Sequence, residues 1–163
     1  MEDANPSKVH ALVDEYEPRV TSAEISEVFK PLREVMTPFI AEIAAAPKRP
    51  TRAPDEVKLN RDAQIAFNKE IAHAIGFDDK AGYLAVSAHP FSESIAPGDT
   101  RMTTRYYDHR FSDSLAATMH ETGHSLYEQG LPKMKLFGQP IAKYISLGVH
   151  ESQSRLWENQ VGR

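Results

Sequence analysis

The sequence predicts a mainly α-helical protein with one small antiparallel pair of β-strands. Apolar residues recur at helical spacing over most of the chain, and each run is bounded by residues typical of helix ends. Two short stretches, YLAVSAHPF and TRMTTRYY, are instead rich in β-branched and aromatic residues and are separated by the turn-like sequence APGD. We therefore expect these two stretches to pair antiparallel, beside helices that form the rest of the fold.

The first expected helix begins at Asn5 and Pro6, a capping side chain followed by a proline at the first helical position. Apolar residues then recur at helical spacing up to Tyr16, and Pro18 stops the run. This pattern predicts one short helix.

The second expected helix carries a long apolar stripe, from Ile25 to Ile43. Thr21 and Glu24 can form a capping box at its start. Pro31 and Pro38 lie inside the stripe and predict a kink or a break. We interpret the stripe as one face of a core helix, with a coiled-coil or dimer face as the alternative.

Residues 46–56 hold three prolines and a cluster of charges, which is typical of a surface loop. The third expected helix begins at about Asn60, and Gly76 followed by Phe77 is the glycine-then-hydrophobe signature of its end. The apolar residues of this helix are Ile65, Phe67, Ile71 and Ile75.

The fourth expected helix begins near Ser112 or Asp113, and Gly130 with Pro132 behind it marks its end. Its apolar side is formed by Leu115, Met119 and Leu126. After a loop, a last helix is best defined over residues 150–163. The loop leaves room for this last helix to return against the fourth.

Composition and charge restrict the class of protein. The net charge of −4 gives no broad basic surface, so we expect no nucleic-acid partner. The absence of cysteine excludes disulfides and thiolate metal sites and fits a reducing compartment. No apolar run is long enough to cross a bilayer, and the first residues do not form a signal peptide. The sequence therefore predicts a soluble, cytoplasmic protein with no membrane partner.

The sequence HETGH places two histidines four positions apart in the fourth expected helix. Positions i and i+4 share one face of a helix, so His120 and His124 can bind one metal ion, and neutral imidazoles are good zinc ligands. Glu121 can take a proton from a metal-bound water and pass it to a leaving amine. The alternative is a solvated helix with two surface histidines. Gly123 argues against it, because glycine costs about 1 kcal/mol relative to alanine here and so calls for a close packing neighbour.

A catalytic zinc site needs a third protein ligand, and Glu151 on the last helix is the best candidate. Glu128 is the competitor, one turn beyond His124. We reject it because a ligand in line with both histidines cannot complete a tetrahedron with them. His150 points about 100° away from its neighbour Glu151 on a helix, so we expect it to support a metal ligand or to face the substrate.

Four motifs of this chain resemble, in order, those of the carboxypeptidase Taq family of metallopeptidases. They are HPF (His89, Pro90, Phe91), DxRxT (Asp99, Arg101, Thr103), HExxH (His120, Glu121, His124) and an HES motif (His150, Glu151, Ser152). The stretches HALVDEYEP, AFNKEIAHAIGFD and AGYLAVSAHPF also look like the family.

The resemblance implies a helical zinc-peptidase fold, with an HExxH helix, a helix for the third ligand and the β-pair beside the active site. It implies release of single residues from peptide C-termini, so peptides are the expected substrates. The metal ligands carried over are His120, His124 and Glu151, and Glu121 is the general base. Members of the family are commonly homodimers that use zinc, sometimes cobalt or another divalent ion.

The candidate substrate-binding residues are Arg101, His89, Asp99, Thr103 and His150. A peptide can add to a sheet edge, and Arg101, on or next to a strand, can pair with a carboxylate or polarise the carbonyl oxygen. The alternative for Arg101 and Asp99 is a structural ion pair that holds the turn. For His89, a structural hydrogen bond is an equally good explanation.

Members of the family are much longer than this sequence, and residues 1–163 resemble a central segment of their helical catalytic domain, truncated at both ends. The family's IRxxAD and GxxQDxHW motifs, which help to bind the substrate's terminal carboxylate, have no match here. Three functions are therefore weighed: a zinc carboxypeptidase, a catalytically incompetent or self-associating helical segment, and a related zinc oligopeptidase. By itself, the 163-residue chain is expected to show little carboxypeptidase activity and not to remain a clean monomer.

Overall fold

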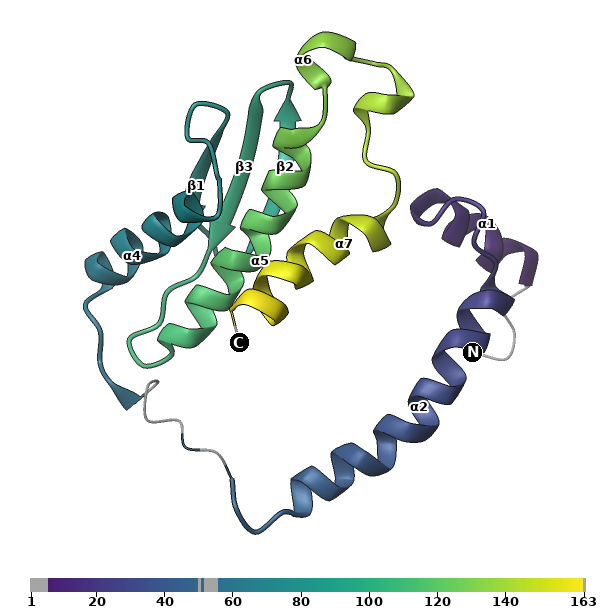
Figure 1. The fold of residues 1–163 in the computed structure, drawn as a ribbon, viewed down its shortest axis with the longest axis horizontal. Coiled ribbons are helices and arrows are strands. Elements are labelled where there is room, and N and C mark those ends of the chain that lie inside the picture. Colours follow the sequence, from purple (N-terminus) through teal and green to yellow (C-terminus); the bar gives the residue numbers. More distant parts are fainter. Residues whose placement is uncertain (1–5, 50, 52–55, 163) are drawn as a thin grey trace. The chain divides into compact units, whose positions relative to one another are not determined.

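The computed structural model describes residues 6–49, 51 and 56–162, and the chain divides into two compact units, Met1–Thr51 and Arg52–Arg163. Six α-helices and one three-stranded sheet occur in the described residues (Figure 1). The first unit shows helices alone, whereas the sheet belongs to the second unit. The mainly helical fold class predicted from the sequence is confirmed.

The first unit contains α1 (Pro6–Tyr16) and α2 (Ser22–Ala45). The capping box predicted for α2 is confirmed, because the Glu24 amide donates to Thr21 Oγ1 (3.2 Å) and the Thr21 amide donates to Glu24 Oε2 (2.8 Å). The cap predicted at Asn5 lies outside the described residues.

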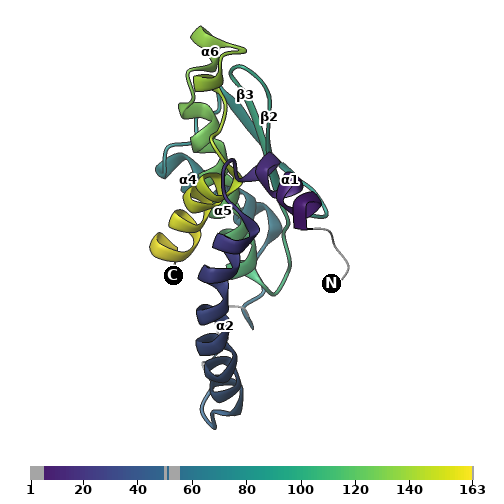
Figure 2. The same cartoon turned by 90° about the vertical axis from the view of Figure 1, so that its right-hand side faces the viewer.

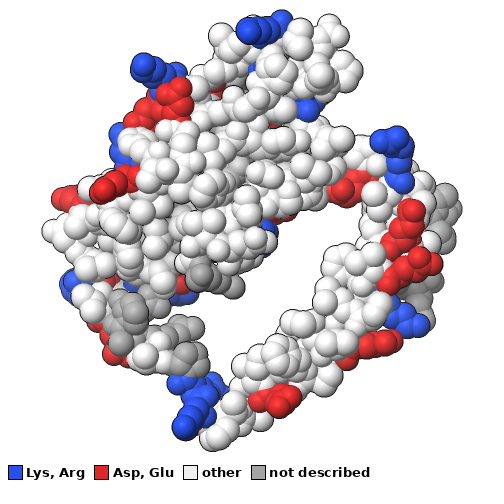
Figure 3. All heavy atoms as spheres, viewed as in Figure 1, with Lys and Arg blue, Asp and Glu red and all other residues white. Residues whose placement is uncertain are grey.

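The apolar stripe of α2 is exposed. The helix runs through Pro31 and Pro38 without a break, and none of its residues is buried; the exposed fraction is 67% for Val28 and 50% for Phe39. Charged side chains lie along one flank of α2 and leave the other flank uncharged (Figure 3). Two helices cannot enclose a stripe of this length, so the predicted core helix is not realised within its unit. In the part of the chain that the structure describes, no helix is long and apolar enough to span a bilayer.

The second unit runs from a helix through the sheet to two crossing helices. Its elements are α4 (Arg61–Ala74), β1 (Gly82–Val86), β2 (Phe91–Ala96), β3 (Asp99–Thr104), α5 (Phe111–Gly130), α6 (Lys133–Leu136), a 3-10 turn (Pro140–Ala142), α7 (Leu147–Arg155) and a π-helical extension (Leu156–Val161). The predicted start of this helix near Asn60 is confirmed, and Asn60 Oδ1 caps α4 by accepting from the amide of Asp62 at 2.7 Å. Gly76, with φ of +114°, follows the helix end in the left-handed conformation that favours glycine.

The sheet differs from the predicted antiparallel pair. Its strand order is β1-β3-β2, with β2 antiparallel to β3 and β1 parallel to it. Residues 83–91 are therefore not one strand, since β1 ends at Val86 and the Ser87 hydroxyl donates to the His89 carbonyl in a turn. Pro90 has no amide hydrogen to extend a ladder. The APGD turn joins β2 to β3, and this pair alone is antiparallel.

α5 lies along β2 and β3 (Figures 1 and 2). It packs on the sheet through small polar side chains. Fully buried on this helix are Ser114, Thr118, Thr122 and Ser125. The hydroxyls of Thr118 and Thr122 donate to carbonyls one turn earlier, at 2.8 and 2.7 Å, so their burial leaves no donor unsatisfied. Met102 of β3 is also fully buried and lies against Thr122. These short side chains allow the helix to approach the sheet closely.

α4 buries a partly polar face in place of the predicted apolar one. Its buried residues are Gln64, Asn68 and Ala72, whereas Ile65, Ile71 and Ile75 are half-buried and Phe67 is exposed. The Gln64 amide donates to the carbonyls of Leu59 (3.2 Å) and Tyr107 (3.0 Å) and accepts from the Ser114 hydroxyl (3.3 Å). Because these bonds compensate its burial, Gln64 can take a core position that apolar periodicity assigns to other residues.

Candidate metal centre

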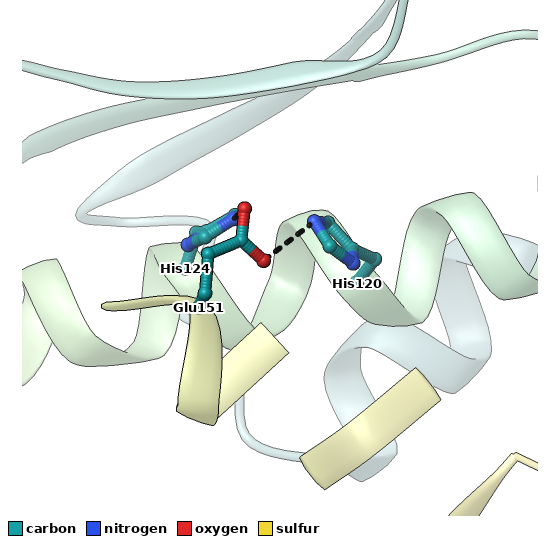
Figure 4. A group of neighbouring side chains, drawn as sticks. All are labelled: His120, His124 and Glu151. Atoms are coloured by element: carbon teal, nitrogen blue, oxygen red, sulfur yellow. Dashed lines mark ion pairs between the residues drawn. The ribbon is translucent and has the colours of Figure 1, made fainter. Parts of the chain in front are cut away.

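Two histidines and a glutamate converge where α7 crosses α5. His120 and His124 lie one turn apart on α5, and Glu151 reaches them from α7 (Figure 4). Glu151 Oε2 is 3.6 Å from His120 Nε2, and Glu151 Oε1 is 3.8 Å from His124 Nε2. Three atoms, one from each side chain, all lie within 4.8 Å of one another. The predicted convergence is confirmed.

The arrangement fits a divalent metal ion. Two ligand atoms of a tetrahedral zinc ion, each at about 2.0–2.1 Å, lie about 3.3 Å apart. The two imidazole–carboxylate distances, 3.6 and 3.8 Å, are within about 0.5 Å of that separation. Imidazole nitrogen and carboxylate oxygen also bind cobalt and other divalent ions, so the donor set alone does not select zinc.

The protonation states of the ligands suit metal binding. Burial, together with repulsion from His150 and His120, lowers the pKa of His124 to about 4, so this imidazole is neutral at physiological pH. Burial acts to raise the pKa of Glu151, but a hydrogen bond from Ser154 and the neighbouring imidazoles hold it below its usual value. A neutral imidazole and an ionised carboxylate are the forms that coordinate a metal.

Gly123 allows α7 to lie directly on α5. A Cβ at this position would be 2.6 Å from the Gln153 carbonyl oxygen and 2.6 Å from Ser154 Cα. The close packing neighbour predicted for this glycine is therefore the backbone of α7. The Ser154 hydroxyl, fully buried at the crossing, donates to Glu151 Oε2 at 2.8 Å and orients that carboxylate toward the histidines.

Glu121 lies beside the three converging side chains and is only 6% exposed. Among the described residues, its Oε2 has no hydrogen-bond partner. Burial first, and repulsion from Glu151 second, raise the pKa of Glu121 to about 7. A carboxyl group with a pKa near neutrality can both accept and release a proton, which is the property required of a general base that later acts as an acid.

In the metal-free protein, Glu121→Gln is expected to raise the free energy of unfolding by about 1–3 kcal/mol more at pH 8 than at pH 5. The pKa of Glu121 rises from 4.5 to about 7 in the folded chain, so wild-type stability is retained at low pH and lost as pH rises through about 7. The lowered pKa of His124 affects the pH dependence of stability equally in the wild type and in Glu121→Gln, so it cancels in the difference. Urea unfolding with a chelator measures the difference, and Glu70→Gln, on the exposed side of α4, is the control. A pH-independent difference would contradict the prediction.

Each histidine also has a partner on its other ring nitrogen. His120 Nδ1 lies 2.9 Å from Glu158 Oε2, and this carboxylate accepts from Arg155 Nη1 at 2.8 Å. Sequence reasoning missed Glu158. The available signal was its spacing of seven residues from Glu151, which in a regular α-helix would place both carboxylates on one face. A carboxylate in this position fixes the orientation of a metal-binding imidazole.

His124 Nδ1 lies 2.6 Å from His150 Nδ1, and His150 Nε2 lies 3.0 Å from Glu128 Oε1. Glu128, the competing ligand candidate, is thus turned away from the metal site and held by His150 and Lys133. Burial acts to raise the pKa of Glu128, but hydrogen bonds from His150 and Lys133 keep it below its usual value. His150 therefore supports a candidate metal ligand, one of the two roles that its position in the sequence predicts.

A cavity of about 410 Å³ opens above the candidate ligands. It is lined by residues 89–94, by side chains of α5 that include Glu121, and by His150 and Glu151 of α7. β2 is an edge strand, paired with β3 on one side. An adjoining hollow of about 480 Å³ shares His89, His120 and Glu121 and continues toward Arg105 and Arg155.

Among the predicted substrate-binding residues, His89 and His150 line the cavity, whereas Asp99, Arg101 and Thr103 are not among its lining residues. Arg101 donates to Asp99 through Nε (3.0 Å) and Nη2 (2.8 Å), the structural ion pair weighed as the alternative. Thr103 Oγ1 accepts from the Phe91 amide (3.1 Å) and lies 2.6 Å from the Ser87 hydroxyl, so it holds the turn between β1 and β2.

Comparison with known proteins gives a match along the entire chain. Residues 1–163 match the family model described as carboxypeptidase Taq (M32) metallopeptidase. Thermostable carboxypeptidase 1 of Thermus thermophilus is 46% identical over 153 residues, which are 94% of this chain and 30% of that protein. Thermostable carboxypeptidase 1 of Pyrococcus furiosus is 37% identical over 155 residues, again 94% of this chain and 31% of the relative.

The fold is likewise similar to a solved structure. The M32 carboxypeptidase from Deinococcus radiodurans R1 has 35% sequence identity and a TM-score of 0.83, over 94% of this chain and 31% of that one. The chain thus spans about 30% of the length of the curated relatives. Because the family model matches residues 1–163, the chain belongs to the carboxypeptidase Taq (M32) metallopeptidase family.

Proposed function

We propose that this chain provides the metal centre of a zinc-dependent metallocarboxypeptidase, which releases single amino acids from peptide C-termini. The observation that carries the proposal is the convergence of His120, His124 and Glu151 beside the buried carboxyl of Glu121. Zinc is the proposed ion, with cobalt or another divalent ion as the alternative. Relatives of 33–46% identity bear the name carboxypeptidase, which supports the substrate class.

The three converging side chains would hold the ion, which supplies Lewis acidity at the scissile carbonyl when bound. Glu121 accepts a proton from the attacking water and delivers it to the leaving amine, two transfers for which a pKa of about 7 is suited. Its burial beside the ligands keeps bulk water away from this proton. Glu158 and His150 hold the two imidazoles in place.

The open edge of β2 is the proposed binding surface for the peptide backbone. The strand lines the cavity, and an extended peptide can pair with its free edge while the scissile bond faces Glu121. His89 and His150, which line the same cavity, are the proposed side-chain contacts. Substrate roles for Asp99, Arg101 and Thr103 remain predictions.

A homodimer and a cytoplasmic location are further parts of the proposal. The exposed apolar stripe of α2 supports self-association, since exposed stripes of this kind commonly mark interaction surfaces. The cysteine-free sequence supports a reducing compartment.

Two peptides of one sequence, with a free or an amidated C-terminus, distinguish the three functions. A carboxypeptidase is expected to remove single residues from the free peptide, to refuse the amide and to stop when a chelator is added. Cleavage of the amidated peptide would instead establish an oligopeptidase. If neither peptide is cleaved, the protein is a catalytically incompetent segment, and elemental analysis then measures how much metal it still binds. This is the outcome expected for the 163-residue chain by itself.

A further inference from the structure

A chain of polar contacts runs from the edge strand β2 to the outer nitrogen of His124. Lys133 donates to Ser94 Oγ of β2 at 2.8 Å and contacts the carboxylate of Glu128. Glu128 also contacts His150, which in turn contacts His124. The Glu128 side chain is 6% exposed and that of Lys133 is 19% exposed, so water competes little for these bonds. None of these four contacts involves the nitrogen atoms that face Glu151.

Each bond in this chain has a direction that its partners determine. A lysine ammonium has only hydrogens to offer, and an ionised carboxylate can only accept. Glu128, paired with Lys133 at one oxygen, therefore accepts at the other, and His150 Nε2 must carry the hydrogen of that 3.0 Å bond. The neutral form of His150 has a single N–H, which this bond places on Nε2, so in that form Nδ1 is an acceptor.

The bond between His150 and His124 then determines which nitrogen of His124 carries the hydrogen. His150 Nδ1 and His124 Nδ1 are 2.6 Å apart, so one of the two must donate. Because His150 Nδ1 accepts, His124 Nδ1 donates. The lone pair of His124 consequently lies on Nε2, the atom 3.8 Å from Glu151 Oε1. The opposite direction would place a hydrogen on Nε2 and prevent coordination.

We propose that Glu128, anchored by Lys133, is a positioning residue: it holds His150 as the neutral Nε2–H form, and His150 in turn holds His124 as the Nδ1–H tautomer with Nε2 free for a metal ion. This proposal rests on the function proposed above. It gives a role to Glu128, the carboxylate that is not one of the candidate metal ligands. His120 obtains the same orientation from Glu158 in a single bond, so the two histidines are controlled separately.

The tautomers can be observed directly, without metal or substrate. Side-chain 1H–15N spectra of the metal-free protein labelled with 15N-histidine are expected to show a hydrogen on His124 Nδ1 and on His150 Nε2. In Glu128→Gln, whose amide can also donate, His124 is expected to become a mixture of both tautomers. Chelator competition should then show zinc affinity about 10–100-fold lower, the usual effect of removing an outer partner of a ligating histidine.

Glu158→Gln is the matched control, because it removes a carboxylate from the other histidine; the His124 tautomer should remain as in the wild type. Lys133→Met, which deletes the anchor and touches neither ring, is the second test if Glu128→Gln does not fold. Lys133 helps to keep the pKa of Glu128 low, and without it the buried carboxyl can take up a proton and donate to His150, so the His124 tautomer is expected to shift in the same direction.

A wild-type spectrum with the hydrogen on His124 Nε2 would overturn the proposal. So would unchanged tautomers and zinc affinity in a folded Glu128→Gln or Lys133→Met protein. The spectra involve no peptide, so the two proposals fail separately. If a protein of its relatives' full length shows these tautomers but does not hydrolyse peptides, the enzyme function is rejected and the positioning role stands.

Discussion

Glu121→Gln is expected to lower the turnover number about 10²–10⁴-fold while zinc affinity stays close to that of the wild type. The glutamine fills the same space but cannot accept the proton of the attacking water. Glu121 contributes no atom to the group of candidate ligands, so its replacement should leave the ion in place. Steady-state peptide hydrolysis and metal content, measured on an active form of the protein, give the two quantities.

Glu151→Gln is the matched comparison, since it makes the same chemical change at a candidate metal ligand. An amide is a weaker ligand than a carboxylate, so zinc affinity is expected to fall more than about 100-fold, beyond the effect typical of an outer partner. Turnover at saturating zinc should recover in part, because Glu121 is intact. Equal loss of metal in the two variants would refute this division of roles.

Gly123→Ala is expected to destabilise the protein by about 1–3 kcal/mol and to weaken metal binding at the same time. The new methyl group would meet backbone atoms of α7 at 2.6 Å, and backbone cannot rotate away as a flexible side chain can. α7 must therefore move, carrying Glu151 away from the two histidines on α5. This loss outweighs the gain of about 1 kcal/mol that alanine usually brings to a helix.

Gly130→Ala is the control on the same helix. A Cβ there would meet no atom within 4 Å, so the substitution should be neutral or slightly stabilising and should leave zinc affinity unchanged. Urea unfolding and chelator competition on both variants separate the steric effect from helix propensity. If Gly123→Ala is as stable as Gly130→Ala and binds zinc equally well, the close crossing of the helices is not what places Glu151.

The convergence of the candidate metal ligands could be predicted from the sequence because most of its geometry is local. The spacing of His120 and His124 fixes their shared face, and a glycine within the same helix indicates where a second backbone approaches. These inferences need only the period of a helix. Glu158 was missed, and it lies in the π-helical extension after α7, where the period of an α-helix no longer holds.

The sheet and the buried face of α4 could not be predicted in this way, because both depend on distant partners. The parallel pairing of β1 with β3 requires the chain to turn at Ser87 and pass through β2 first. Gln64 is buried because the Tyr107 carbonyl and the Ser114 hydroxyl satisfy its amide. The spacing of apolar residues predicts where apolar side chains are buried, but it does not predict these hydrogen-bond partners of Gln64.

α7 supplies the third candidate ligand, Glu151, and its π-helical extension supplies Glu158, the carboxylate that contacts His120 Nδ1. A metal ion held as proposed would therefore act as a removable cross-link between α5 and α7, in a sequence that has no cysteine to form a covalent one. Separation of the two helices would break the ligand bond and the outer hydrogen bond together. With an ion bound as proposed, metal binding and docking of α7 on α5 would be one cooperative event. The free zinc concentration would then set the fraction of molecules in which the two helices are docked.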